Sequence, residues 1–220
     1  MTDWLSRALN ALLPLCAVTT TGVLVHREYS GPAAAAVTEQ VSAPPPTQIR
    51  DWQRYASSGH RLGPDSAAVT VVVFSDFQCP ACRVLAESLR EIRRRHPGKV
   101  AVVYRHYPLP IHAAARAAAG ASECAADQHR FEAFHDTLFT AQDTLGQVDW
   151  ERLARAAGVP DLARFTRCTA SAGTSYRIQE DAAAATQLEV RATPTILING
   201  LRLVGAPRLY VLEEMVAREL

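Results

Sequence analysis

The 220-residue sequence has almost no net charge, because 23 basic side chains are balanced by 22 acidic ones. A protein that binds nucleic acid through a broad basic surface carries a clear excess of positive charge. The near balance therefore argues against that class, and we expect no nucleic-acid partner.

The sequence also lacks several well-defined catalytic motifs. It contains no glycine-rich phosphate loop, no Gly-x-Ser-x-Gly nucleophile motif and no His-Glu-x-x-His zinc motif. These absences argue against a P-loop nucleotide hydrolase, an α/β-hydrolase and a zinc peptidase of that type. We expect neither a cofactor nor a bound metal.

The first 28 residues contain a long uncharged run. Residues 8–25 read ALNALLPLCAVTTTGVLV and follow Arg7. Eighteen residues of helix reach about 27 Å, close to the thickness of the hydrocarbon core of a bilayer. We expect residues 1–28 to be a single-pass anchor that holds the remaining chain outside the cytoplasm. A cleaved signal, giving a secreted or periplasmic protein, and a soluble segment are the alternatives.

Proline and alanine dominate the next stretch, which ends in the run Pro44-Pro45-Pro46. Such a composition is typical of a partly stiffened linker, and we assign residues 29–48 to it. The remaining residues, 49–220, are long enough for one domain, and the apolar fraction of 48% is sufficient for a packed core.

The pattern of this domain predicts an α/β fold. Residues 69–74 (VTVVVF) and 99–105 (KVAVVYR) are expected strands, and a helix that opens at Cys79-Pro80 lies between them. A strand, a helix and a strand of these lengths predict a βαβ unit with parallel strands.

A block of helices is expected next, over about residues 112–188, with breaks near Gly120 and His129. Asn199-Gly200 predicts a hairpin between strands 195–198 and 201–204, followed by a final helix. The order is therefore βαβ, helices, then ββα.

Cys79 and Cys82 are the strongest candidates for chemistry. Cys79 stands at the expected start of a helix, where free backbone N–H groups and the helix dipole favour a thiolate. Cys82 lies one turn further, so it can close a disulfide or resolve a mixed one. Pro80 and Ala81 place no charge between them. A redox pair is the preferred interpretation; a structural disulfide and half of a zinc site are the alternatives.

Four segments together resemble the DsbA-like branch of the thioredoxin superfamily: FSDFQCPACR, ASECAADQHRFEAFHDTLF, Cys168 with its surroundings, and ATPTILINGLRLVG. The resemblance covers about residues 50–220. It implies a thioredoxin fold with a helical insertion between the βαβ and ββα halves, which here follows the membrane segment. It also implies that Pro194 is a cis proline facing Cys79 and Cys82, and that the backbone of Thr193 binds an extended substrate.

The resemblance implies an enzyme that passes its Cys79–Cys82 disulfide to reduced secreted proteins. Its reoxidising partner would be a membrane quinone-linked protein of the DsbB or VKOR type, and the enzyme itself would be a monomer. A reductase or isomerase with the same cysteines, and a non-catalytic binding module or chaperone, are the rival functions.

Cys124 and Cys168 would be bonded in an oxidising compartment, as in many relatives, or else buried as two free thiols. Asp76 either tunes the Cys79 thiolate or caps the local backbone. Relatives often carry a buried acid at the position of Val73, so a proton relay through that position is in doubt. The histidines, His106 and His112 among them, are expected at the surface or in packed positions.

Overall fold

The computed structural model describes residues 45–170 and 176–220. The expected membrane segment and most of the expected linker lie outside the described residues. Among the residues that are described, no helix is both long enough and apolar enough to cross a membrane.

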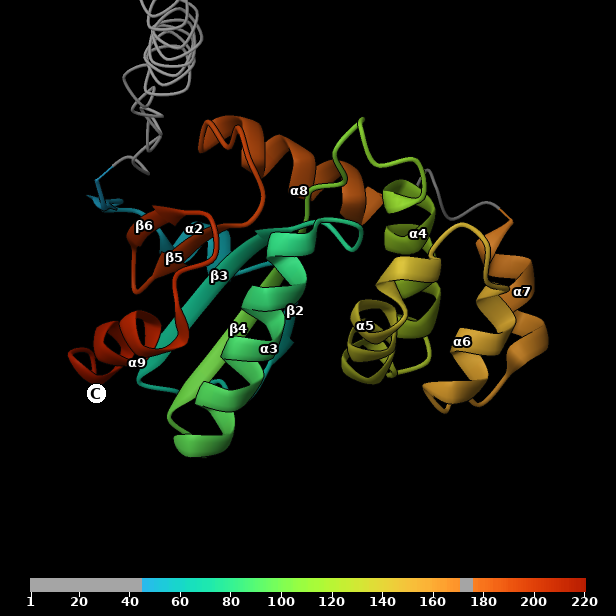
Figure 1. The fold of residues 1–220 in the computed structure, drawn as a ribbon, viewed down its shortest axis with the longest axis horizontal. Helices are drawn as coiled ribbons and strands as arrows, with labels where there is room; N and C mark the ends of the chain where they lie inside the picture. Colours follow the sequence, from blue (N-terminus) through green and yellow to red (C-terminus); the bar gives the residue numbers. More distant parts are fainter. Residues whose placement is uncertain (1–44, 171–175) are drawn as a thin grey trace, which may run out of the picture. The chain divides into compact units, whose positions relative to one another are not determined.

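A single mixed sheet forms the centre of the described domain (Figure 1). Its strand order is β1-β6-β5-β3-β4-β2, and only β3 and β4 pair in parallel. In chain order the strands are β1 (Thr47–Gln48), β2 (His60–Leu62), β3 (Val69–Ser75), β4 (Val100–His106), β5 (Thr195–Ile198) and β6 (Leu201–Val204).

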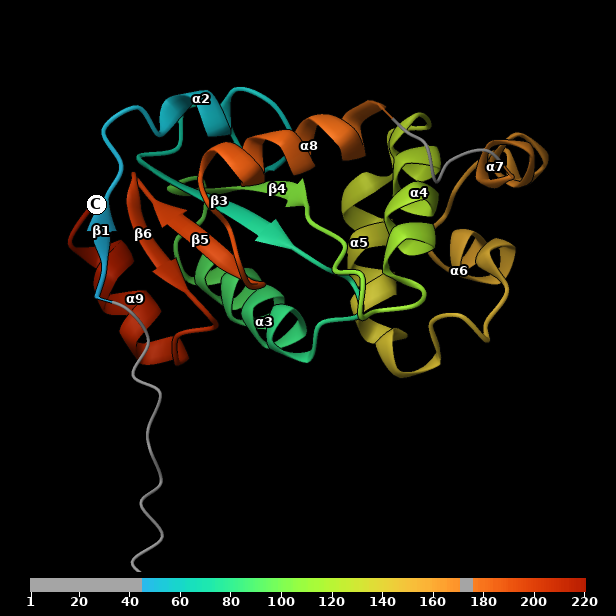
Figure 2. The same cartoon turned by 90° about the horizontal axis from the view of Figure 1, so that it is seen from above.

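Helices cover both faces of this sheet (Figure 2). Helices α3 (Pro80–Arg95) and α9 (Leu209–Ala217) lie on one face, and α2 (Gln53–Ala56) and α8 (Tyr176–Gln187) lie on the other. Every residue of β3 and of β4 is buried, as continuous apolar strands covered on both sides must be.

Alternate side chains of β3 therefore enter two separate cores. Val71 and Val73 pack in the core that contains residues of α3 and α9. Val72 and Phe74 pack in the core that contains residues of α2 and α8. This alternation follows from the two-residue period of a strand. The parallel pairing of β3 with β4, which α3 connects, confirms the predicted βαβ unit.

The predicted helical insertion lies between β4 and β5. Its first part consists of α4 (Ala115–Ala126), α5 (Phe131–Thr140), the 3-10 turn η1 (Gln142–Thr144), α6 (Trp150–Ala156) and α7 (Leu162–Thr169), and α8 completes it. The expected break near His129 is present, because His129 has a left-handed backbone with φ 59°. The expected break at Gly120 is wrong: α4 continues through it. One glycine costs a helix only about 1 kcal/mol, and this one is buried among alanines that pack against the core.

The sequence analysis missed three short elements at the start of the domain. Strand β1 consists of two residues that we assigned to the linker, Thr47 and Gln48, and they pair with Arg202 and Leu201. Helix α2 and strand β2 were not predicted at all. Elements of two to four residues show no periodic pattern, and their positions depend on a distant partner strand.

Cys124 of α4 and Cys168 of α7 are joined by a disulfide with an S–S distance of 2.00 Å. The bond connects two helices of the insertion whose cysteines are 44 residues apart in the sequence. Of the two alternatives that the sequence left open, the structure has the bonded pair.

Replacing both Cys124 and Cys168 by alanine should lower the free energy of unfolding by about 3–4 kcal/mol, because the unfolded chain gains the entropy of a long open loop. Urea denaturation followed by circular dichroism measures this loss. The matched control is the Cys79→Ala, Cys82→Ala chain, which keeps the insertion disulfide. A loss of less than about 1 kcal/mol relative to the parent would contradict the assignment of the bond as a major stabilising link.

Candidate active site

The two cysteines of the Cys-Pro-Ala-Cys motif lie at the start of α3. Strand β3 ends at Ser75, and Cys79 is the N-cap residue of the helix, with an extended backbone (φ −74°, ψ 120°). Pro80 is the first helical residue, where its missing N–H costs no hydrogen bond. The N–H of Cys82 donates to the carbonyl of Cys79 at 3.0 Å, so the second cysteine belongs to the first turn.

The thiol of Cys79 is unusually acidic. Its pKa is lowered from 9.0 to about 5, chiefly because the Cys82 thiol donates a hydrogen bond to its sulfur. Partial burial opposes this shift, and the backbone N–H groups of Cys82 and Ala81 add to it. A sulfur at a helix N-terminus is stabilised as a thiolate in this way.

Cys82 has the opposite character. Its side chain is 1% exposed, against 7% for Cys79. Burial, and next its hydrogen bond to Cys79, raise its pKa well above the usual range. The same turn of helix therefore holds one acidic thiol and one thiol that stays protonated. Both cysteines are free in this structure, so it represents the reduced form.

The loop before β5 faces the nucleophile. The Thr193–Pro194 peptide bond is cis, and the Sγ of Cys79 donates to the carbonyl oxygen of Thr193 at 3.3 Å. Strand β5 pairs antiparallel with β3, which brings residues 114 positions apart in the sequence into contact. The structure thus places the carbonyl of the cis Thr193–Pro194 bond next to Cys79, as the resemblance implies.

Asp76 holds the loop that leads to Cys79. Its buried carboxylate accepts hydrogen bonds from the backbone N–H groups of Gln78 and Leu109, each at 2.7 Å. It also contacts the Nδ1 of His112 at 2.7 Å. These are the contacts of a backbone cap, which is one of the two roles we considered for it. His112 is thus a partner of the active-site loop.

Two glutamines that the sequence analysis missed connect this loop to the insertion. The Nε2 of Gln142 donates to the carbonyl oxygens of Phe77 at 2.7 Å and of Cys79 at 3.0 Å. The Oε1 of Gln78 accepts from the N–H of Ala114 at 2.5 Å. No motif marks a glutamine that binds a distant backbone, so the sequence carried no signal for them.

A cavity of about 30 Å³ lies next to Cys82. Val73, Ser75 and Tyr104 are among the residues that line it. Tyr104 is 2% exposed, and burial raises the pKa of its hydroxyl well above the usual value. At the position where relatives often carry an acid, the cavity wall is the apolar side chain of Val73.

Comparison with known proteins identifies the family of the chain. The thioredoxin family matches residues 56–217. A thioredoxin-like oxidoreductase from Silicibacter pomeroyi superposes with a TM-score of 0.63 at 25% identity, covering 77% of this chain and 97% of that one. BdbD from Bacillus subtilis, in its oxidised form, gives 0.64 at 25% identity, covering 72% and 91%.

A curated relative, Na(+)/H(+) antiporter NhaA 1 of Mycolicibacterium gilvum, is 35% identical over 174 residues. The match covers 76% of this chain but only 27% of that protein, so the chain spans about a quarter of the length of this relative. What the longer protein transports is a property of that protein.

The chain belongs to the thioredoxin family. Within it, the domain resembles thiol–disulfide oxidoreductases of the DsbA-like branch, both in its fold and in the Cys79–Cys82 pair at the start of α3.

Alkylation of Cys79 by iodoacetamide should remain fast at pH 7 and decline as the pH falls through about 5, because only the thiolate reacts. The folded pKa lies below that of an unfolded cysteine, about 8.5. The ionised Cys79 therefore stabilises the folded, reduced form fully above about pH 8.5. This stabilisation is lost as the pH falls through about 5. Mass spectrometry of the alkylated peptide gives the profile. A midpoint near 8.5 would contradict the lowered pKa, and Cys79→Ser should abolish the fast reaction.

Replacing Gln142 by leucine should destabilise the reduced chain by about 1–3 kcal/mol, because two buried carbonyl oxygens lose their donor. Urea denaturation measures the effect. The matched control is Gln147→Leu at an exposed position of the same segment, where we expect less than about 0.5 kcal/mol. Equal effects of the two substitutions would show that Gln142 does not support the loop.

Proposed function

We propose that the chain introduces disulfides into secreted proteins by transferring its own Cys79–Cys82 disulfide. The observation that carries this proposal is the contrast between the two thiols: Cys79 has a pKa of about 5, whereas burial raises that of Cys82. A stabilised thiolate stabilises the reduced enzyme, and an enzyme whose reduced form is stable is a strong oxidant.

The proposed reaction begins when a substrate thiolate attacks the Sγ of Cys79. The Cys79–Cys82 bond breaks, and Cys82 leaves as a thiolate that takes up a proton. A second substrate thiolate then attacks the substrate sulfur of the mixed disulfide, and Cys79 leaves as the stable thiolate. The substrate loses two electrons as its disulfide forms, and the enzyme gains them. Cys79 is the more exposed of the two sulfurs, so it is the one that a substrate reaches, and its low pKa makes it a good leaving group in the second step.

A polypeptide substrate fits the surroundings of Cys79. The side chain of Ile111 is 83% exposed and lies two residues after Leu109, whose N–H binds Asp76 of the active-site loop. The backbone of Thr193 adjoins Cys79 on another side. An exposed apolar side chain and an adjacent backbone segment are features that bind extended peptides.

The proposal includes a place and a partner for the enzyme. We place the catalytic domain outside the cytoplasm, on a single-pass anchor or free after signal cleavage. The uncharged run over residues 8–25 supports this placement. A membrane quinone-linked protein of the DsbB or VKOR type would restore the Cys79–Cys82 disulfide, and the enzyme would act as a monomer.

The reduction potential of the Cys79–Cys82 pair tests the direction of electron flow. We expect a value near about −120 mV after equilibration with glutathione buffers, as for the strong oxidants of this fold. A value near about −270 mV, as in thioredoxin, would reject the oxidase and favour a reductase. Oxidation of a reduced, unfolded substrate protein should also cease in the Cys79→Ser variant, whereas a non-catalytic binding module would retain its function.

A further inference from the structure

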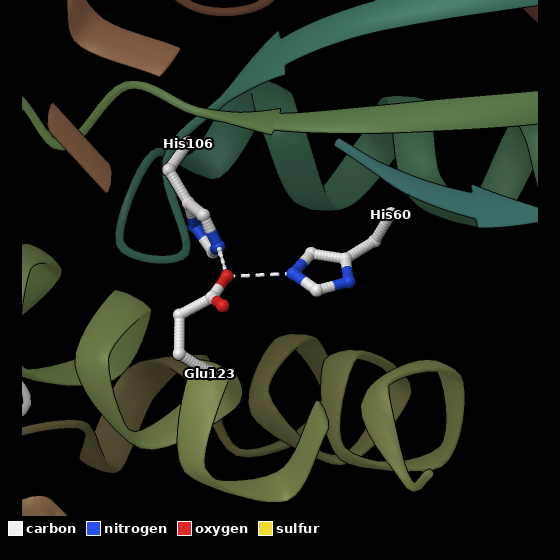
Figure 3. Close-up of side chains that lie close together, drawn as sticks. All are labelled: His60, His106 and Glu123. Carbon is white, nitrogen blue, oxygen red and sulfur yellow. Dashed lines mark hydrogen bonds and ion pairs between the residues drawn. The ribbon is translucent and has the colours of Figure 1, made fainter. Parts of the chain in front are cut away.

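Three side chains that the proposed redox function does not use meet beside the end of β4, where β2, β4 and α4 approach one another (Figure 3). His60 comes from β2, His106 from the end of β4 and Glu123 from α4. The Nε2 atoms of His60 and His106 both contact the Oε1 of Glu123, at 2.6 and 2.7 Å. We had expected His106 in an ordinary surface or packed position.

The charge of Glu123 determines the present hydrogen bonds. Burial alone would raise its pKa, but the contacts with His106 and His60 outweigh burial and lower the pKa to about 2. An ionised carboxylate only accepts hydrogen bonds. Each Nε2 must therefore carry a proton, and two N–H groups point at one oxygen atom.

We propose that His60, His106 and Glu123 bind one divalent transition-metal ion of the zinc class. Two imidazole nitrogens and a carboxylate oxygen form a common donor set for zinc with an open fourth position. Harder ions such as calcium and magnesium require mostly oxygen ligands, so this set favours zinc, cobalt, nickel or copper. The proposal does not depend on the proposed redox function.

Only a small movement separates the present geometry from a metal complex. The ligand atoms of the three side chains lie within 4.8 Å of one another. Around a tetrahedral zinc ion, neighbouring donors are about 3.3 Å apart. The hydrogen-bonded N···O pairs must therefore open by about 0.7 Å. Each neutral ring must also change tautomer, so that its proton moves from Nε2 to Nδ1 and Nε2 is free to bind the ion. His60 lies on the short edge strand β2, and its ring is stacked on Phe131 with the ring centroids 3.6 Å apart, so the ring would move along the face of Phe131.

A route for the ion lies beside His60. A cavity of about 420 Å³ is lined by His60 and Arg177 and by the carboxylates of Glu180 and Asp181. The exposed Glu180 adds negative charge at this opening and attracts cations to it, whereas the buried Asp181 carboxylate is already paired with Arg105. The fourth position would be filled by water from the same cavity.

Two features limit the affinity. The Nε of Arg177 lies 3.4 Å from the Oε2 of Glu123, so this cation competes with the metal. The Nδ1 of His106 is buried and has no hydrogen-bond partner among the described residues, whereas a metal-bound imidazole is normally strengthened by an acceptor at its other nitrogen. We therefore expect micromolar rather than nanomolar binding.

The test uses the full chain with the Cys79–Cys82 disulfide formed and Cys16 alkylated, so that no free thiol binds metal. Zinc is titrated in competition with a chromophoric chelator, and cobalt is titrated by its visible absorption. We expect one ion per chain, with cobalt bands in the visible region and no thiolate charge-transfer band. No binding at 100 µM zinc would overturn the proposal.

Two substitutions and one control assign the ligands. His60→Ala and Glu123→Gln should each weaken zinc binding by at least about tenfold. The control His129→Asn changes an exposed histidine outside the cluster and keeps a residue that accepts a left-handed backbone, so affinity should stay within twofold. Zinc should raise the melting temperature of the parent and of His129→Asn, but not that of the two cluster variants. Binding that survives both cluster substitutions would place the metal elsewhere and reject the site.

The substitution Arg177→Gln should strengthen zinc binding rather than weaken it. Removing the competing cation should tighten zinc binding by about threefold, the size expected for one partly exposed charge. Circular dichroism checks that each variant is folded. Weaker binding in Arg177→Gln would contradict the assigned position of the metal next to Glu123.

Discussion

Strands β3 and β4 run side by side in parallel, and their register aligns Ser75 with His106. The loop after Ser75 carries Asp76 and then Cys79, while the chain after His106 turns back so that the N–H of Leu109 reaches Asp76. One pair of strands therefore positions the redox cysteines and one of the proposed metal ligands. Because both strands are fully buried between two cores, a shift of their register would disrupt both sites at once.

The chemistry of the site depends on the different environments of Cys79 and Cys82, which lie within the first turn of α3. Cys79 caps the helix and meets its free N–H groups, whereas Cys82 is buried in the core next to the small cavity lined in part by Val73, Ser75 and Tyr104. The hydrogen bond from the Cys82 thiol, with help from the helix N–H groups, lowers the pKa of Cys79, whereas burial raises the pKa of Cys82. Two identical side chains three residues apart thus acquire opposite acidities, and no neighbouring charged residue is required.

The features that could be predicted from the sequence are those encoded by neighbouring residues. The run VTVVVF, the Cys79-Pro80 helix start and the Asn199-Gly200 hairpin each have a local pattern, and each occurs as predicted. Gln142 and the pair of His60 with Glu123 have no such pattern. They act on atoms about 63 positions away in the sequence, so only the folded chain brings them into contact. The two-residue strand β1 was missed for the same reason.

The redox site and the proposed metal site have no side chain in common, but the same strand and helix support both of them. Asp181 of α8 accepts a hydrogen bond from the N–H of His106 at 2.7 Å and pairs with Arg105 of β4 at 2.5 Å. Helix α8 then leads into the loop that holds Thr193 beside Cys79. The backbone of one proposed metal ligand is therefore fixed to the helix that precedes the cis-proline loop. The redox reaction uses none of the three proposed donor atoms, so this shared framework is the physical connection through which one site can affect the other.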